Sequence, residues 1–208
     1  RIDLQGFVSR DYDGTASINL SGVTPTLTGI FSGDTVTVAT GSVSGFVDKN
    51  AGSNKAVNYT GFALSGAQAG NYMLSANSAS STASINAKTL TLSGLLAANK
   101  EYDGTTAATV TSFGSVTGMV GSETLTLDHG SASFDTKNKG DSKTVTASGY
   151  RLYDGSNGGL ASNYVLSATS ATTTANVTAK AITISGITAA NKVYDGSTSA
   201  TLDTTYAS

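Results

Sequence analysis

The sequence predicts an all-β fold in which tandem antiparallel β-sandwich repeats, immunoglobulin-like or β-grasp-like, form an elongated array. Apolar and polar residues alternate along many short segments, as in TLTLS at 89–93 and ANVTA at 175–179. Successive side chains of a strand point to opposite faces, so this alternation predicts sheets with one apolar face and one Ser/Thr face. The second observation is an internal repeat. The third is a supply of 24 glycines, which together with Asn and Asp provide the turns.

The internal repeat is clearest around the tripeptide Tyr-Asp-Gly. It occurs in SRDYDGTASINLS at 9–21, in NKEYDGTTAATVT at 99–111 and in NKVYDGSTSATLD at 191–203. The agreement continues beyond the motif, since FVDKNAGSNKAVNYTG from position 46 matches FDTKNKGDSKTVTASG from position 134. Self-similarity at a fixed, domain-sized period is the signature of a repeat protein.

The repeat divides the chain into three parts. We predict a first β-repeat at 1–87, a second at 88–179 and the truncated start of a third at 180–208. Each complete repeat is large enough to bury a core of its own. We therefore expect the chain to be a segment cut from a longer array.

The strands expected from the alternation follow one another in order along the chain. They are RIDLQ at 1–5, TVTVA at 35–39, ASINA at 83–87, TLTLS at 89–93, TLTLD at 124–128, KTVTA at 143–147, ANVTA at 175–179 and AITIS at 181–185. Six or seven such strands per repeat, separated by turn residues, favour a sandwich. Only LLAANKE at 95–101 approaches helical spacing, over about two turns. Used as a helix, it would favour the β-grasp alternative.

Charge and composition exclude several classes of protein. The net charge is −2 and the 12 basic residues are not clustered, which argues against a nucleic-acid partner. The chain has no Cys, so it carries no disulfide, no thiol chemistry and no zinc-thiolate site. No apolar run is long enough to form a membrane-spanning helix, so we expect no direct membrane insertion.

We predict that the Tyr-Asp-Gly motif is a structural corner. Asp can accept a hydrogen bond from the backbone two residues further on, and Gly accepts a positive φ. The Tyr ring can pack on the core or on a neighbouring repeat while its hydroxyl finds a partner. The residues assigned to this structural motif are Tyr12, Asp13, Gly14, Tyr102, Asp103, Gly104, Tyr194, Asp195 and Gly196.

A calcium site at the three motif aspartates is the alternative reading of the motif. Calcium requires six to eight oxygen ligands, usually with several carboxylates close in sequence. The third copy has Val193 where the other copies carry Asp11 and Glu101. We therefore expect no metal site and no cofactor.

The ordered set of motifs resembles a known family. An opening NKxYDGTTxAT is followed by GD or SE before an alternating strand, and then by KNxGxxK, NYxLS and TAxIxAKxLTLSG. This set resembles the YDG-type repeats of filamentous-haemagglutinin-like adhesins, the large exoproteins of two-partner secretion systems in Gram-negative bacteria. The resemblance covers essentially the whole chain.

The resemblance implies a function and a location. It implies a secreted protein or an outer-surface stalk of many repeats, which holds a binding region away from the cell in cell adhesion or joins cells in a biofilm matrix. The expected role is a structural stalk or spacer whose partners are the neighbouring repeats of the same chain. Extracellular polysaccharide and other cells are further candidate partners.

The sequence does not predict an enzyme. His129 is the only histidine, and it lies in a Gly/Ser turn, LDHGSAS, which the first repeat matches with VATGSVS. A His-dependent catalytic or metal site would therefore exist in one repeat and not in the other. No nucleophile, base and orienting group assemble around it in the sequence pattern, so an exposed turn residue is expected.

A carbohydrate- or matrix-binding module is the alternative function. Sugar rings stack on exposed aromatic side chains. Tyr59 and Tyr153 are the candidates for such ligand contacts because the two repeats do not share them. Tyr153 is assigned to the loop at 150–163, where the second repeat is longer than the first.

Three Asn-x-Ser/Thr sequons are candidate glycosylation sites. They begin at Asn19, Asn58 and Asn176. The period of two places each Asn on the face opposite its apolar neighbours, so all three are expected to be accessible.

Overall fold

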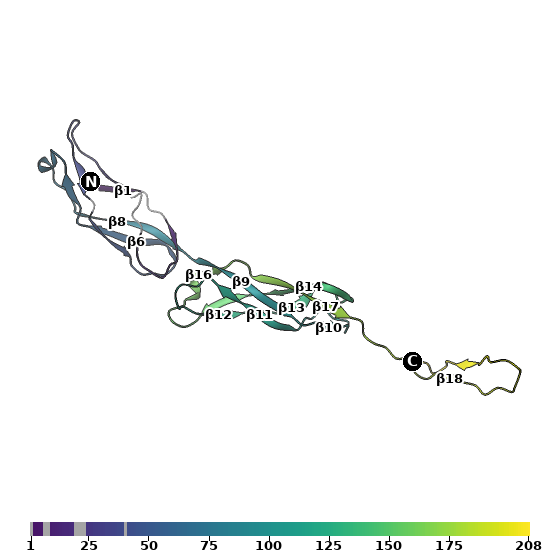
Figure 1. Cartoon of the computed structure of the whole chain (residues 1–208). Coiled ribbons are helices and arrows are strands. Elements are labelled where there is room, and N and C mark those ends of the chain that lie inside the picture. The colour runs from purple at the N-terminus through teal and green to yellow at the C-terminus, as the bar shows by residue number, and fades with distance from the viewer. Residues whose placement is uncertain (1, 6–8, 19–23, 40) are drawn as a thin grey trace.

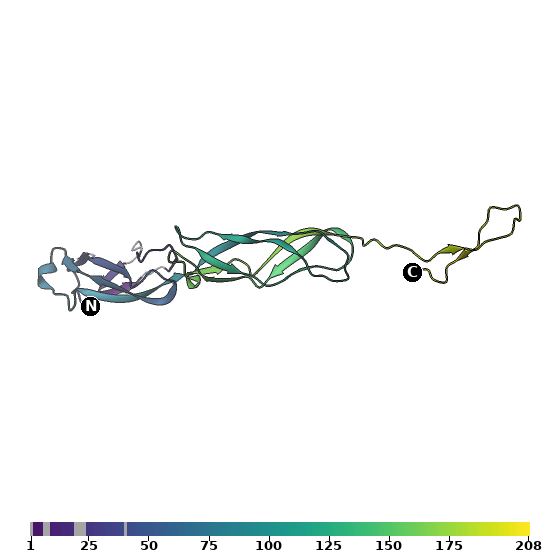
Figure 2. The same cartoon turned by 90° about the horizontal axis from the view of Figure 1, so that it is seen from below.

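The computed structural model describes residues 2–5, 9–18, 24–39 and 41–208. Strands make up 47% of it and helices 3%, so the all-β prediction is confirmed. In Figure 1 the first repeat, the second repeat and the C-terminal tail follow one another from purple to yellow. The view turned by 90° in Figure 2 has the same elongated outline.

The first repeat forms one four-stranded sheet and two strand pairs. The sheet has the order β2-β8-β6-β5, while β1 pairs with β3 and β4 pairs with β7. The bounds of the elements are β1 (Ile2–Gln5), β2 (Arg10–Asp11), β3 (Thr24–Leu27), β4 (Thr37–Ala39), β5 (Ser42–Phe46), β6 (Gly52–Thr60), β7 (Ala63–Ser65), the 3-10 helix η1 (Ala69–Asn71) and β8 (Ser78–Asn86).

The second repeat has the same order of strands in its four-stranded sheet. That sheet is β10-β17-β14-β13, beside a three-stranded sheet β11-β9-β16 and the pair β12-β15. The bounds are β9 (Lys88–Ala97), β10 (Lys100–Glu101), β11 (Val110–Thr117), β12 (Leu125–Asp128), β13 (Ala132–Phe134), β14 (Gly140–Ser148), β15 (Arg151–Asp154), η2 (Ala161–Asn163), β16 (Tyr164–Leu166) and β17 (Ser170–Thr178).

Each four-stranded sheet buries one face, as the alternation predicts. In β6 of the first repeat Val57 and Tyr59 are buried and the intervening Asn58 is exposed. The same alternation continues at Ala83 and Ile85 of β8. The equivalent buried positions of the second repeat are Val145, Ala147, Ala175 and Val177.

A parallel pairing decides where each repeat presents its Tyr-Asp-Gly motif. β2 is the strand just before the motif and β8 is the last strand of the repeat, and the two are parallel, with Asp11 opposite Asn86. The motif that follows β2 therefore lies at the end where the chain leaves the repeat. There the backbone N–H of Tyr12 donates to the carbonyl of Asn86 at 2.9 Å. β10 and β17 pair in the same way in the second repeat.

The two repeats are joined without a linker. β8 ends at Asn86 and β9 begins at Lys88, so one residue separates the last strand of the first repeat from the first strand of the second. β9 is the central strand of its sheet, antiparallel to β11 and parallel to β16. The connecting chain is thus held by hydrogen bonds on both sides of the boundary.

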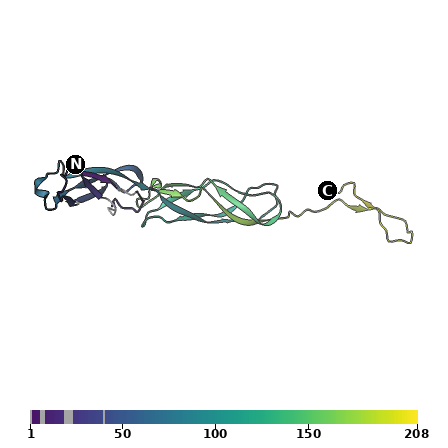
Figure 3. The same ribbon diagram turned by 90° about the horizontal axis from the view of Figure 1, so that it is seen from above.

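Residues 180–208 form a tail and not a folded repeat. β18 (Thr188–Ala189) pairs only with β19 (Leu202–Asp203) among the described residues, and every tail residue is exposed. The predicted strand at 181–185 does not form. Its counterpart β9 is held along its length by β11 and β16, whereas the only strand pairing in the described tail is that of β18 with β19, which correspond to the end of β9 and the start of β11. The yellow segment in Figures 1 and 3 extends away from the second repeat accordingly.

Residues 95–101 do not form the helix that the β-grasp alternative requires. Residues 95–101 contain the end of β9 and all of β10, because Leu95 is needed on the buried face of β9, where it packs in a core cluster with Tyr150. The described helices, η1 and η2, are three residues each. Within the described residues, no helix has the length and apolar character needed to cross a membrane.

Candidate functional site at the repeat junction

The Tyr-Asp-Gly motif forms the same local corner in all three copies. In the first, Asp13 Oδ1 accepts hydrogen bonds of 2.8 Å from both the backbone N–H and the hydroxyl of Thr15. Gly14 follows with φ +81°, in the left-handed region that favours glycine. The equivalent bonds run to Asp103 from Thr105 and to Asp195 from Ser197. The motif and the Thr or Ser that directly follows its glycine therefore determine the shape of the corner.

A cation three residues before the aspartate completes each corner. Arg10, Lys100 and Lys192 form these ion pairs, at 2.5, 2.8 and 2.8 Å respectively. The hydrogen bonds from Lys100 and Thr105 hold the pKa of Asp103 at about 2. One oxygen of each motif aspartate is thus committed to the turn and to its cation.

The side chain of Tyr12 extends from the first repeat into the second. Its hydroxyl donates to Oε1 of Glu123 at 2.6 Å, and Nζ of Lys49, also from the first repeat, donates to the same oxygen at 2.8 Å. Oε2 of Glu123 accepts a hydrogen bond of 2.7 Å from the hydroxyl of Tyr164. Glu123 is only 7% exposed and Tyr12 only 1%. We call Tyr12, Lys49, Glu123 and Tyr164 the junction cluster.

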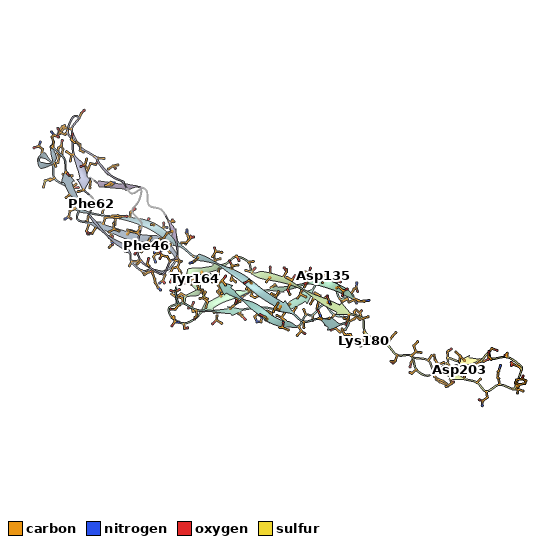
Figure 4. All side chains as sticks on the ribbon, viewed as in Figure 1. Phe46, Phe62, Asp135, Tyr164, Lys180 and Asp203 are labelled. Carbon is orange, nitrogen blue, oxygen red and sulfur yellow. The ribbon has the colours of Figure 1, made fainter. Side chains whose placement is uncertain are left out.

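Aromatic and apolar contacts surround these polar bonds. The rings of Tyr12 and Tyr164 meet edge to face, with centroids 5.4 Å apart, and Nζ of Lys49 lies 5.8 Å from the centroid of the Tyr12 ring. One buried cluster contains Phe46 from the first repeat and Leu90 from the second. Figure 4 labels Phe46 and Tyr164 on the two sides of the boundary. The apolar core is therefore continuous across the junction.

A buried asparagine adds a second polar contact. Oδ1 of Asn163, which is fully buried, accepts a hydrogen bond of 2.8 Å from the backbone N–H of Ala51. Its Nδ2 donates to Oδ1 of Asn50 at 3.2 Å. The backbone N–H of Val120 in turn donates to the Tyr164 hydroxyl at 3.0 Å. Because a buried amide without partners is costly, the two bonds of Asn163 to the first repeat fix how the repeats dock.

The repeats also approach each other closely at Gly14. A Cβ built on Gly14 would lie 2.7 Å from Cγ1 of Val120, across the junction. A Cβ on Gly104, the same motif position in the second repeat, would meet no atom within 4 Å. The first motif is therefore covered by a neighbouring repeat and the second is open.

Burial and hydrogen bonds determine the protonation states of the four side chains in the junction cluster. Burial raises the pKa of Glu123, but the hydrogen bonds it accepts, above all from Lys49, outweigh burial and bring the pKa below its ordinary value of 4.5. Burial and the hydrogen bond to Glu123 raise the pKa of Tyr12, and they raise that of Tyr164 to about 12. The bond to Glu123 also raises the pKa of Lys49. At neutral pH the cluster therefore holds one carboxylate, one ammonium and two neutral phenols.

The other two motif tyrosines lie outside this junction. Tyr102 is half-buried and packs against the core of the second repeat. Tyr194, in the tail, is 92% exposed. The structure thus brings the first motif copy to a neighbouring repeat, while the second and third copies keep the same corner without such a neighbour.

The structure contradicts one of the two candidate ligand-contact tyrosines and changes the placement of the other. Tyr59 is only 4% exposed and stacks on Phe62, with ring centroids 6.3 Å apart, so it offers no ring face to a ligand. Tyr153 is 50% exposed but does not lie in the inserted loop. It belongs to β15, opposite Thr126 of β12, and the extra residues of the second repeat follow that strand.

The remaining predicted residues are dispersed. Asn58 is exposed on β6, and Asn176 on β17 is half-buried, with Oδ1 accepting from the N–H of Ser142 at 2.7 Å. Asn19 lies outside the described residues. His129 is exposed between β12 and β13, where its ring stacks on Phe113. These residues form no common site with the junction cluster.

Sequence reasoning missed three residues of the junction. Lys49 lies in the KNxGxxK motif, Asn163 begins the NYxLS motif, and Glu123 stands in the SE dipeptide that corresponds to GD in the first repeat. Their recurrence between repeats was a usable signal. Recurrence identifies equivalent positions in the two repeats, but it does not show which motif of one repeat contacts which motif of the other.

The fold and the junction define an all-β repeat protein whose repeats are joined through a buried carboxylate. The YDG domain matches residues 3–81 and 86–174, and the chain belongs to the YDG domain family. Comparison with curated proteins and with solved structures finds no match. The two matches confirm the predicted YDG-type repeats, and the relation to filamentous-haemagglutinin-like adhesins stays a prediction.

The Tyr12 hydroxyl should contribute measurably to stability. Tyr12→Phe removes the donor to Glu123, and we expect a loss of about 1.5–3 kcal/mol in the free energy of unfolding, as for a hydrogen bond to a charged group. Denaturant unfolding measures the change. Tyr102→Phe is the matched control, and its effect should stay below about 0.5 kcal/mol because that ring is not buried at a junction. Equal effects of the two variants would contradict a special role for the junction.

The stability that Glu123 provides should depend on pH. Its folded-state pKa is lowered, so its contribution is complete above the ordinary value of 4.5 and is lost as the pH falls through the folded-state pKa. We expect the difference in unfolding free energy between the natural chain and Glu123→Gln to be largest at neutral pH and to narrow in acid. Chemical unfolding over a pH series tests this. A difference that is constant with pH would show that Glu123 is not ionised in the junction.

Proposed function

We propose that the chain is a structural stalk or spacer segment of a large bacterial adhesin, secreted or bound to the outer cell surface, that mediates attachment between cells, to a matrix or to a surface. Its two YDG domains and the motif resemblance support this role. We further propose that the sheets of each repeat act together as one sandwich-like unit of an elongated array. The partners of each unit are then its neighbours in the same chain.

The observation that carries this proposal is the shared carboxylate of Glu123. A stalk must hold each repeat in a fixed orientation relative to the next, so the junctions between repeats must resist bending. Rotation of one repeat against the other would separate Glu123 from Tyr12 and Lys49 and leave a buried carboxylate with fewer donors. With one residue between β8 and β9, the joint has little chain in which to absorb a bend.

The expected stiffness can be measured with paired labels. The chain has no Cys, so Ala56→Cys and Thr144→Cys, at equivalent exposed positions of the two repeats, give one label site each. We expect a narrow distribution of the distance between the two spin labels, measured by pulsed electron paramagnetic resonance. Adding Tyr12→Ala should broaden it, because that change removes a ring and a hydrogen bond from the joint, whereas Tyr102→Ala should leave it narrow. A broad distribution in the natural background would overturn the stiff stalk.

A carbohydrate- or matrix-binding module is a second candidate, favoured by one surface feature. A groove of about 430 Å³ lies beside β15 and β16, and Tyr153 and Arg151 line it together with Val165. Tyr153 and Val165 are both about half exposed. An exposed ring beside an arginine and apolar side chains matches the way in which proteins hold sugar faces.

Competition separates the two candidate functions. If the chain is a stalk, an excess of purified chain should leave the attachment of producing cells unchanged. If it is a binding module, the excess should reduce attachment, and Tyr153→Ala should abolish that reduction without lowering the unfolding midpoint. Binding that persists in Tyr153→Ala would exclude the groove as the binding surface.

A further inference from the structure

The first repeat carries its own copy of the acceptor half of the junction. Asp34 occupies the position that Glu123 has in the second repeat, and Tyr72 occupies that of Tyr164. The Tyr72 hydroxyl donates to Oδ2 of Asp34 at 2.5 Å and accepts from the backbone N–H of Phe31 at 3.1 Å. The bonds of Tyr164 to Glu123 and Val120 have the same arrangement. We call Phe31, Asp34, Asn71, Tyr72 and Met73 the acceptor face.

The acceptor face is open where its counterpart is covered. Asn71 is exposed, whereas the equivalent Asn163 is fully buried against the first repeat. Phe31 is 79% exposed and Met73 90%, which are high values for large apolar side chains. In Figure 3 the second repeat and the tail lie away from the end of the first repeat that points away from the second.

A small hollow lies on the acceptor face beside Tyr72. A cavity of about 40 Å³ lies on this face, lined by Tyr72, Met73 and Ile30 among others. In the second repeat, Met119 stands at the position of Ile30, and it packs against the buried cluster that contains Tyr12. At the junction within the chain, the ring of Tyr12 from the preceding repeat meets Tyr164, the counterpart of Tyr72, edge to face.

The opposite end of the two-repeat body carries the matching donor half. Tyr102, Lys137 and Asn138 stand at the positions of Tyr12, Lys49 and Asn50. Tyr102 is half-buried and the other two are exposed, and the space around Gly104 is open. The tail does not cover this end, since every residue from 178 to 208 is exposed. We call Tyr102, Lys137 and Asn138 the donor end.

We propose that the acceptor face binds the donor end of a second copy of this chain, so that copies associate head to tail. Lys137 of one copy meets Asp34 of the other, as Lys49 meets Glu123 within the chain, and Tyr102 meets Tyr72, as Tyr12 meets Tyr164. The charges are complementary, and Phe31 loses exposed apolar area, since its counterpart Val120 is half-buried at the junction within the chain. Since the two surfaces differ and lie at opposite ends of an elongated body, the contact is heterologous and repeats from copy to copy as a filament.

Association between separate copies is weaker than the joint within the chain. Within the chain the covalent connection from β8 to β9 holds the two halves at a local concentration that is typically millimolar for short connections. Asp34 is also one methylene shorter than Glu123, so the donor end must approach more closely to reach it. We therefore expect association to appear in concentrated solution and in end-to-end arrays.

Carbodiimide crosslinking of the natural chain tests the contact directly. The reagent joins a lysine amine to a neighbouring carboxylate as an amide, and it leaves as its urea. We expect a crosslinked peptide pair containing Lys137 and Asp34, formed between isotopically labelled and unlabelled copies, together with a ladder of dimers and longer species. The Lys49 to Glu123 crosslink within one chain is the internal positive control.

Charge-reversal variants test whether the ion pair between Lys137 and Asp34 is responsible for the association. In sedimentation velocity up to about 1 mM chain, K137E alone and D34K alone should each weaken association at least tenfold. Their mixture should restore it, because each altered end then faces an opposite charge on the other variant. K180E, which changes the same charge on the exposed tail, should associate like the natural chain.

Two outcomes would overturn the proposal. One is a chain that stays monomeric throughout this range and gives the Lys49 to Glu123 crosslink but no Lys137 to Asp34 crosslink. The other is association that K180E weakens as much as K137E. Either result leaves the stalk proposal intact, because the labels at Ala56→Cys and Thr144→Cys, in chain diluted with unlabelled chain, report on the joint within one chain.

Discussion

The arrangement of the two repeats depends on one desolvated carboxylate. Glu123 belongs to the second repeat, yet two of its three side-chain donors, Tyr12 and Lys49, come from the first. A buried carboxylate is stable only while its hydrogen bonds are intact. The repeats therefore cannot separate without exposing the carboxylate to water or leaving it unpaired, and the apolar core that continues from Phe46 to Leu90 reinforces the same geometry.

The position of this contact follows from strand direction. The parallel pairing of β2 with β8 places an early motif beside the exit of the chain, where the hydrogen bonds of Asp13 and the positive φ of Gly14 form the corner that follows Tyr12. The same pairing and the same corner recur at Asp103. A motif that is only a turn in its own repeat thus becomes a docking element for the next one.

Much of the fold could be predicted from the sequence, because period-two alternation and glycine turns are local signals. The motif corners were predictable for the same reason. The junction was not, since Tyr12 and Glu123 are separated by 111 positions and no local pattern pairs them. Tyr59 was misread because its lack of a counterpart tyrosine suggested exposure. Its counterpart, Ala147, is also buried, so the position is a core site filled by side chains of different size.

The single residue between β8 and β9 also determines how the protein bears load. Tension applied along the long axis passes from one strand directly into the next through Ala87. β8 is bound along its length to antiparallel β6, and β9 to antiparallel β11. Tension in this direction loads many backbone hydrogen bonds in parallel, so they must break together and not one at a time. A segment built in this way behaves as a tether whose resistance is set by the rate of forced unfolding.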